Sequence, residues 1–208
     1  SILPWVRLEK EGVVVRKIRP TGPVVQPDEL EQQIRAGTRV FCTSWVNSFT
    51  GVAVDVVALG EVCRKKGVIF VLNGAQAVGT LPLNVATLPV DAIATTGAKW
   101  LCGPYGTGFC WVRSDVLKTL ENKKLYWLAL QGSRALNRMR EYELRESLGA
   151  SAFDVFATGN FMNFVPWMAS IEYLLAHPPV NDLQDLPGYQ IKAVEKVYKK
   201  LNLNEKRH

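Results

Sequence analysis

Hydrophobic and polar positions alternate along the first 120 residues in a way that predicts strands and helices in turn. Apolar runs bounded by glycine, proline or polar residues predict strands over 12–18, 39–44, 68–72, 91–94 and 108–112. Helical patterns predict helices over 29–34 with Asp28 as cap, 56–66 between Asp55 and Gly67, and 116–120 after Ser114. Strands that alternate with helices are typical of an α/β fold with a mostly parallel sheet.

A different pattern follows residue 125. Aromatic residues are mixed there with Arg134, Arg138, Arg140 and Arg145, which we expect to be solvated, with binding of a substrate carboxylate as the alternative. A strongly apolar stretch over 160–175 predicts a buried helix with Pro166 in its first turns. The break at His177-Pro178-Pro179 divides the chain into a main segment, 1–176, and a linker with a C-terminal basic amphipathic helix, 177–208.

Charge is concentrated at the C-terminal end. The 208 residues carry a formal charge of +6, and residues 189–208 alone hold six Lys or Arg against two Glu. We interpret this as the solvated face of one helix, and a basic nucleic-acid-binding fragment is the alternative. Hydrophobic residues make up 48% of the chain, which is typical of a globular protein, and no apolar run approaches the ~20 residues that span a membrane.

The cysteines and histidines exclude several kinds of chemistry. Four cysteines lie in apolar stretches without a CxxC pair, which predicts buried thiols in a reducing cytoplasm and no metal site. Only His177 and His208 are present, so a serine or cysteine nucleophile activated by histidine is not expected. Any acid–base chemistry then falls to a lysine or a carboxylate, with help from a cofactor.

Polar residues follow three of the predicted strands, over 43–51, 73–79 and 95–108. Parallel sheets bind ligands beyond the carboxyl ends of their strands, so these segments hold the candidate site. Lys99 follows a strand among small residues. In a partly apolar cleft its ammonium form would be disfavoured, and a neutral amine can form a Schiff base. A surface lysine in a loop is the alternative.

One predicted strand ends in Asn73-Gly-Ala-Gln76, Lys99 follows the next strand, and a Gly-Pro-x-Gly-x-Gly loop comes after it over 103–108. The order of these motifs resembles the class V aminotransferase family. Its members are pyridoxal-phosphate (PLP) enzymes of fold type I and include cysteine desulfurases and isopenicillin-N-epimerase-like proteins. The resemblance runs from Ser1 to about Leu175. It implies a three-layer αβα large domain, apparently truncated, with the family's phosphate loop upstream and its small domain downstream.

The resemblance also implies roles for single residues. Lys99 would hold PLP as a Schiff base and move the substrate Cα proton, Gln76 would bond the cofactor's phenolic oxygen, and Thr96 would contact its phosphate. Ser48 stands in place of an asparagine common in the loop before the PLP strand. Gly159-Asn160 lies where the family often has Gly-Thr, a pair that reaches the phosphate of a neighbouring subunit, so the resemblance implies a homodimer.

Two further positions depart from the family pattern. Asn73 replaces the aspartate that keeps the pyridine nitrogen protonated, so we expect PLP binding to survive better than carbanion chemistry. A turn residue without a cofactor role is the alternative for Asn73. Ala98 replaces a histidine of the desulfurases. The expected function is therefore transamination, desulfuration or epimerisation of an amino acid, and the alternative is a degenerate, non-catalytic homologue that dimerises or binds a partner.

Overall fold

The computed structural model describes residues 2–121, 143–145, 148–154 and 160–177. Its strands are β1 (Val40–Ser44), β2 (Ile69–Asn73), β3 (Ala92–Thr96) and β4 (Gly108–Val112). Its α-helices are α1 (Ile2–Arg7), α2 (Pro27–Gln33), α3 (Val56–Lys66), α4 (Ser114–Leu117) and α5 (Phe161–Ala176). Two 3-10 helices are η1 (Leu8–Glu11) and η4 (Gly149–Phe153).

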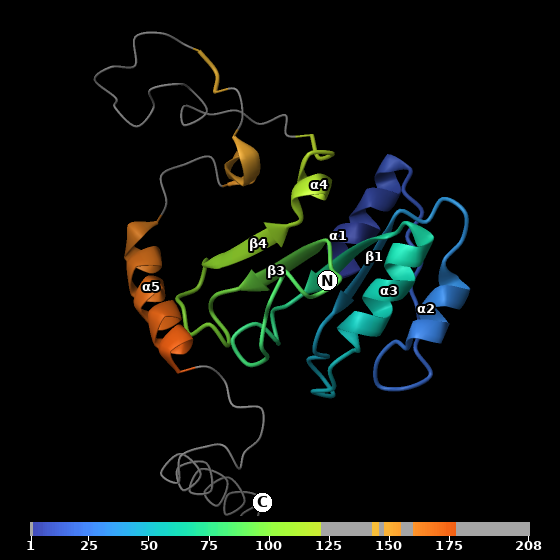
Figure 1. Cartoon of the computed structure of the whole chain (residues 1–208), viewed down its shortest axis with the longest axis horizontal. Helices are drawn as coiled ribbons and strands as arrows, with labels where there is room; N and C mark the ends of the chain where they lie inside the picture. The colour runs from blue at the N-terminus through green and yellow to red at the C-terminus, as the bar shows by residue number, and fades with distance from the viewer. Residues whose placement is uncertain (1, 122–142, 146–147, 155–159, 178–208) are drawn as a thin grey trace, which may run out of the picture.

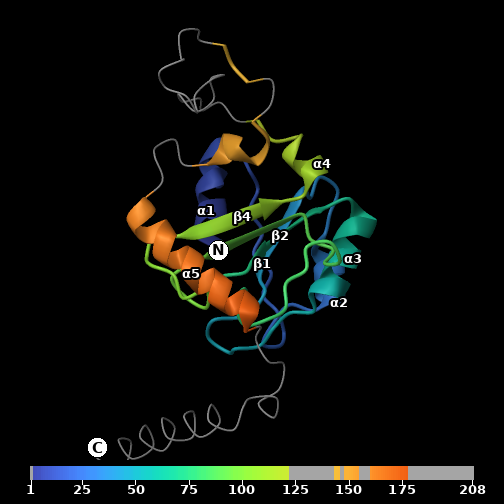
Figure 2. The ribbon, with the colours of Figure 1, turned by 60° about the vertical axis from the view of Figure 1, so that its left-hand side comes forward.

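The described strands form one sheet in the order β1-β2-β3-β4. The β1–β2 and β2–β3 pairs are parallel and the β3–β4 pair is antiparallel, so the predicted mostly parallel sheet is confirmed. Helices α2 and α3 lie on one side of the sheet, and α5 lies beside the connected ends of β3 and β4 (Figures 1 and 2). A mostly parallel sheet packed with helices is the predicted α/β architecture.

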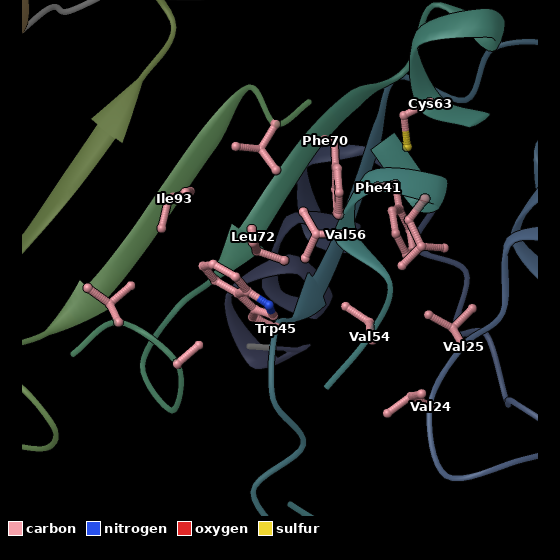
Figure 3. Packing of buried hydrophobic residues seen from close by; sticks show 14 of the residues in the cluster. Val24, Val25, Phe41, Trp45, Val54, Val56, Cys63, Phe70, Leu72 and Ile93 are labelled. Atoms are coloured by element: carbon pink, nitrogen blue, oxygen red, sulfur yellow. The ribbon is translucent and has the colours of Figure 1, made fainter. Parts of the chain in front are cut away.

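The core lies between the sheet and helices α2 and α3. Phe70, Leu72 and Ile93 are fully buried on β2 and β3. Phe70 stacks on Phe41 of β1 with ring centroids 5.4 Å apart, and Figure 3 shows both rings beside Val56 at the start of α3. Apolar side chains from neighbouring strands thus meet on one face of the sheet. The continuous apolar run over 68–72 predicts a strand covered on both faces, but Ile69 and Val71 are only half-buried.

Helix α3 has the predicted bounds. The Asp55 side chain accepts a hydrogen bond of 2.9 Å from the Ala58 N–H, and Gly67 ends the helix in the left-handed region with φ 65°. Leu59 and Cys63 lie one turn apart and are buried. This local fit explains why the sequence pattern placed the helix correctly.

Asp91 joins three strands at the end of the sheet opposite the candidate site. Its Oδ2 accepts a hydrogen bond of 2.7 Å from the Phe70 N–H of β2. Its Oδ1 forms an ion pair of 2.7 Å with Arg113 Nη1, directly after β4. Because Asp91 is buried and directly precedes β3, one carboxylate fixes the β2–β3 and β3–β4 pairings together.

The predicted strand over 12–18 is wrong. Residues 13–20 have no regular secondary structure, and Val14 is 83% exposed. Gly12 ends η1 with φ 85°, and the Val13 N–H bonds back to the Leu8 carbonyl oxygen. A run of β-branched residues forms a strand only when a neighbouring strand pairs with it, and none among the described strands does so here.

Two predicted helix starts are shifted. Helix α2 begins at Pro27 after Gln26, whose N–H bonds Glu29 Oε2 at 2.9 Å, so Asp28 lies inside the helix and does not cap it. Helix α4 begins at Ser114 and ends at Leu117, three residues short of the predicted end. In both cases the residue before the helix has taken the cap position, a difference within the normal uncertainty of helix ends.

Helix α5 is predicted at nearly the correct bounds, but its predicted burial is wrong. Trp167 is its buried residue, whereas Phe161, Met162 and Val165 are 71%, 84% and 59% exposed. A single small sheet domain covers one face of such a helix, so the other apolar faces stay exposed. The apolar pattern therefore does not distinguish a buried helix from one with an uncovered apolar face.

The cysteines only partly follow the prediction of buried thiols. Cys63 is buried and Cys42 is half-buried, but Cys102 and Cys110 are exposed, and all four are free thiols. Burial, with the nearby Asp91 charge, raises the pKa of Cys63 to about 12. Burial also raises the pKa of Cys42, against a smaller lowering effect of Trp5.

Three predictions fall partly or wholly outside the described residues. These are the division at residue 176, the basic C-terminal helix, and the roles of Arg134, Arg138, Arg140 and Gly159. Within the described ranges, no helix is long and apolar enough to cross a membrane. The same ranges contain no cluster of three His, Cys, Asp or Glu side chains suited to hold a metal ion.

Candidate functional site

The carboxyl ends of the three parallel strands meet at one edge of the sheet. Ser44 at the end of β1 pairs in register with Asn73 at the end of β2, and Asn73 pairs with Ala94 of β3. The Trp45 N–H continues the ladder with a hydrogen bond of 2.9 Å to the Asn73 carbonyl oxygen. The segments that follow β2 and β3 therefore begin at the same edge of the sheet.

Asn73 occupies the centre of this edge and starts a tight turn. Its Oδ1 accepts a hydrogen bond of 2.9 Å from the Ala75 N–H, and the Val78 N–H bonds the Gly74 carbonyl oxygen at 2.8 Å. This side-chain-to-backbone contact is the turn role considered for an Asn-Gly pair. A role toward a cofactor nitrogen stays a prediction.

Gln76 lies in the same turn and contacts the segment after β3. The indole Nε1 of Trp100 donates a hydrogen bond of 3.1 Å to Gln76 Oε1. This contact joins the two predicted site segments and brings Gln76 beside the residue that directly follows Lys99. Sequence reasoning did not identify Trp100, because no local pattern relates side chains 24 residues apart.

Lys99 lies in a closed loop after β3. Thr96 is the last residue of β3 and is half-buried, whereas Lys99 is exposed among the described residues. The Gly103 N–H bonds the Gly97 carbonyl oxygen at 2.8 Å and closes the loop around Lys99. Lys99 is therefore exposed in the loop after β3, as expected for the surface lysine that was the alternative to a partly apolar cleft.

Helix α5 supports this loop through one of its faces. Asn163 Nδ2 donates a hydrogen bond of 2.8 Å to the Tyr105 carbonyl oxygen, and Ser170 Oγ donates one of 3.0 Å to the Cys102 carbonyl oxygen. Between them Trp167 packs so closely on Gly97 and Gly103 that a Cβ at either glycine would overlap its ring. Positions 163, 167 and 170 share one helix face, which the hydrophobic pattern alone did not single out.

The loop contains one strained residue. Cys102 has φ 52°, a left-handed conformation that is uncommon for a residue other than glycine. Its carbonyl oxygen is the acceptor of the Ser170 hydroxyl, and its N–H bonds the Lys99 carbonyl oxygen at 3.0 Å. The contact with α5 therefore holds the conformation of the segment that follows Lys99.

Two predicted site residues lie away from these contacts. Ser48 is exposed in the turn after β1, and the hydrogen bonds of that turn are made by Asn47, whose Oδ1 accepts from the Phe49 N–H at 2.9 Å. Asn160 is exposed and directly precedes α5. The described contacts bring neither residue together with Lys99.

Comparison with known proteins places these features in a family. The chain matches the family model Aminotransferase class-V over residues 1–197. It is 30% identical over 175 residues to a probable cysteine desulfurase of Methanothermobacter thermautotrophicus, an alignment that covers 84% of this chain and 42% of that protein. An isopenicillin N epimerase of Amycolatopsis lactamdurans is 37% identical over 129 residues, with 59% of this chain and 32% of that protein covered.

The fold comparison agrees with the sequence comparison. The apo structure of a cysteine desulfurase from Thermococcus onnurineus NA1 matches with a TM-score of 0.70 and 26% identity, and the match covers 84% of this chain and 42% of that chain. The chain thus spans less than half the length of these relatives.

Proposed function

Because the chain belongs to the class-V aminotransferase family, we propose that it forms the central part of a PLP-dependent enzyme that acts on an amino acid. Its reaction would be transamination, desulfuration or epimerisation. The observation that carries this proposal is the arrangement of Asn73, Gln76, Thr96 and Lys99 at the carboxyl ends of two adjacent parallel strands. Parallel sheets of this kind bind ligands at that edge.

The residues at this edge fit the chemistry of PLP. When bound, PLP supplies an electrophilic carbon for an amine and a ring that withdraws electrons from the substrate Cα. Lys99 provides the amine, and the hydroxyl of Thr96 and the amide of Gln76 provide donors for phosphate and phenolic oxygens. Asn73 provides an amide and no negative charge, so the fit is good for binding and incomplete for electron withdrawal.

In this proposal the residues of the chain have separate tasks. Lys99 would hold the cofactor covalently through its Nζ, and once the substrate amine has displaced it, the freed Nζ would accept and return the substrate proton. The loop closed between Gly97 and Gly103, packed on Trp167, restricts the positions of that amine. A fixed amine reacts faster than a mobile one because less entropy is lost in reaching the reactive geometry.

A spectrum with added PLP tests the Lys99 assignment. We expect a visible absorption band, and after borohydride reduction we expect the cofactor to remain attached to the peptide that contains Lys99. Lys99→Ala should lose both signals, and Lys118→Ala, which removes another exposed lysine, should retain both. A band that persists in Lys99→Ala, or no band in the wild-type protein, would overturn the assignment.

A non-catalytic homologue is the second candidate, and Asn73 favours it because the amide supplies no charge at the pyridine nitrogen. The same spectrum separates the candidates. An enzyme of this family should change its visible band when amino acids are added, whereas a protein that only binds PLP should keep the band unchanged with every amino acid tested.

We also propose that the protein is a homodimer. The exposed apolar side chains of Phe161, Met162 and Val165 lie on α5 beside Asn160, the residue expected to reach a neighbouring phosphate. Exposed apolar patches mark interaction surfaces. Sedimentation should show a dimer that Met162→Glu weakens, whereas Val14→Glu, at an equally exposed apolar residue elsewhere, should leave it intact. A monomeric wild-type protein would exclude the dimer.

A further inference from the structure

Trp100 connects the two segments that carry the proposed PLP residues. It directly follows Lys99 in the loop after β3, and its indole Nε1 donates a hydrogen bond of 3.1 Å to Oε1 of Gln76 in the turn after β2. The two side chains therefore meet across the carboxyl ends of neighbouring strands.

The chemistry of this contact fixes which way the amide faces. An indole N–H only donates, so Gln76 must present its oxygen to Trp100 and its NH2 group to the other side. Within the part of the chain that the structure describes, that NH2 group has no hydrogen-bond partner. An amide held in this way offers donors and not an acceptor to a ligand at the sheet edge.

The backbones of the turn after β2 and the loop after β3 lie in close contact. A Cβ at Gly79, in the turn after Gln76, would lie 2.5 Å from the Trp100 carbonyl oxygen, and Gly79 has φ 103°. The Ala77 N–H bonds the Gly74 carbonyl oxygen at 2.9 Å in the same turn. The two backbones thus approach as closely as glycine allows, and the Trp100–Gln76 contact does not depend on flexible segments.

We propose that Trp100 is a positioning residue, whose indole N–H orients the Gln76 amide so that its NH2 group donates to the phenolic oxygen of PLP. This rests on the proposed PLP function. A phenolic oxygen that carries negative charge accepts hydrogen bonds, so the opposite amide orientation would set two oxygens against each other. Trp100 selects the productive orientation before the cofactor arrives.

The contact itself can be tested without PLP. In an amide correlation NMR spectrum, Gln76→Leu should move the indole N–H signal of Trp100 and leave that of Trp111 unchanged. An unmoved Trp100 signal would overturn the inference whatever the cofactor does, because the contact would then be absent in solution.

The consequence is tested with PLP on Trp100→Phe, which keeps an aromatic ring and removes the N–H, and on the matched control Trp111→Phe. Loss of one hydrogen bond should weaken PLP binding about three- to tenfold in Trp100→Phe. It should also raise the pH midpoint of the visible band by about half a unit, because the phenolic oxygen then competes more strongly for the proton of the lysine–PLP linkage. Trp111→Phe should change neither quantity.

A double variant separates positioning from general damage. If Trp100 acts through Gln76, Trp100→Phe should have no further effect on the pH midpoint in a Gln76→Leu background. Additive shifts, or a normal midpoint in Trp100→Phe, would overturn the inference. A wild-type protein that gives no visible band would instead reject the PLP proposal, while the NMR experiment still decides the contact.

Discussion

At the scale of single residues, Asn73 determines how strongly the proposed site can withdraw electrons. Asn73→Asp retains an oxygen for the Ala75 N–H, so the turn should be unchanged, and it adds a negative charge at the end of β2. A charged partner stabilises a protonated pyridine nitrogen better than an amide does. We expect amino acids to change the visible band of the PLP-loaded variant about five- to tenfold faster, measured by stopped-flow absorbance.

The control for this substitution is Asn84→Asp. Asn84 Oδ1 accepts from the Ala86 N–H at 3.0 Å, so it makes the same kind of turn contact in a different loop. Its conversion to aspartate should leave the rate at the wild-type value. Equal rates for Asn73→Asp and the wild type would show that Asn73 has only its turn role.

The positions of the candidate site residues were predictable, because the sequence shows where the strands end: β2 ends at Asn73 and β3 at Thr96. The roles of these two residues, and those of Gln76 and Lys99, come from the resemblance to the family and stay predictions. Trp100 was not predictable as a partner of Gln76, because their contact depends on how two strands pair. The contact between Asn47 Oδ1 and the Phe49 N–H is local. Asparagine commonly makes such contacts in turns, but the prediction for this turn named Ser48.

At the scale of elements, the packing of α5 on the lysine loop depends on the absence of a side chain at Gly103. A Cβ there would overlap the Trp167 ring. Gly103→Ala should therefore push α5 away from the loop and lower the free energy of unfolding by about 1–3 kcal/mol, measured by denaturant titration. PLP binding should weaken with it, because the same loop carries Lys99.

Gly22 provides the matched control. Nothing lies within 4 Å of a Cβ at this position, and its φ is outside the left-handed region. Gly22→Ala should leave the free energy of unfolding unchanged or raise it slightly. A Gly103→Ala variant as stable as Gly22→Ala would contradict the described packing of α5.

The β2–β3–β4 pairing depends on Asp91. Asp91→Ala leaves the buried Phe70 N–H without an acceptor and Arg113 without its less exposed partner, so the free energy of unfolding should fall by about 2–3 kcal/mol. Asp115→Ala removes the other acid that contacts Arg113, on the surface, and should have little effect on the free energy of unfolding. Thermal unfolding of the two variants measures the difference. Equal losses of stability would show that the contacts of Asp91 do not hold the strands together.

The elements were predictable where a local signal and the tertiary fold agree. Helix α3 has a capping carboxylate, a terminal glycine and buried residues one turn apart, and its predicted bounds hold. The run over 12–18 has β-branched residues but no pairing strand among those described. Its β propensity alone therefore predicted a strand that does not form. The sequence pattern predicted α5 as a helix. It did not predict the burial of α5, because burial depends on which other elements pack against the helix.

At the scale of the whole molecule, the proposed site lies at one edge of the described sheet. The chain spans 42% of the length of a cysteine desulfurase that it resembles. The four predicted PLP residues Asn73, Gln76, Thr96 and Lys99 come from the segments after β2 and β3, and α5 supports those segments from the side. We infer that stability of the sheet and geometry of the site are coupled, because the same β2–β3 pairing determines both.

The stability of the whole chain should fall at alkaline pH because of Cys63. Its pKa is raised to about 12 in the folded protein, mainly by burial and further by the Asp91 charge. A thiol with a raised folded pKa stabilises the fold fully below the unfolded pKa, near 9, and that contribution is lost as pH rises toward 12. Between pH 9 and 11 the loss should be on the order of 2 kcal/mol.

Denaturant titrations across this range test the effect. Lysines and tyrosines also titrate there, so the informative quantity is the difference from Cys63→Ala, which has no thiol at this position. Cys63→Ala should be less stable than the wild type at pH 7 because it leaves a small cavity, and its stability should fall less steeply above pH 9. Cys102→Ala, which removes an exposed thiol, should retain the wild-type slope. Parallel curves for all three proteins would show that ionisation of Cys63 does not control alkaline unfolding.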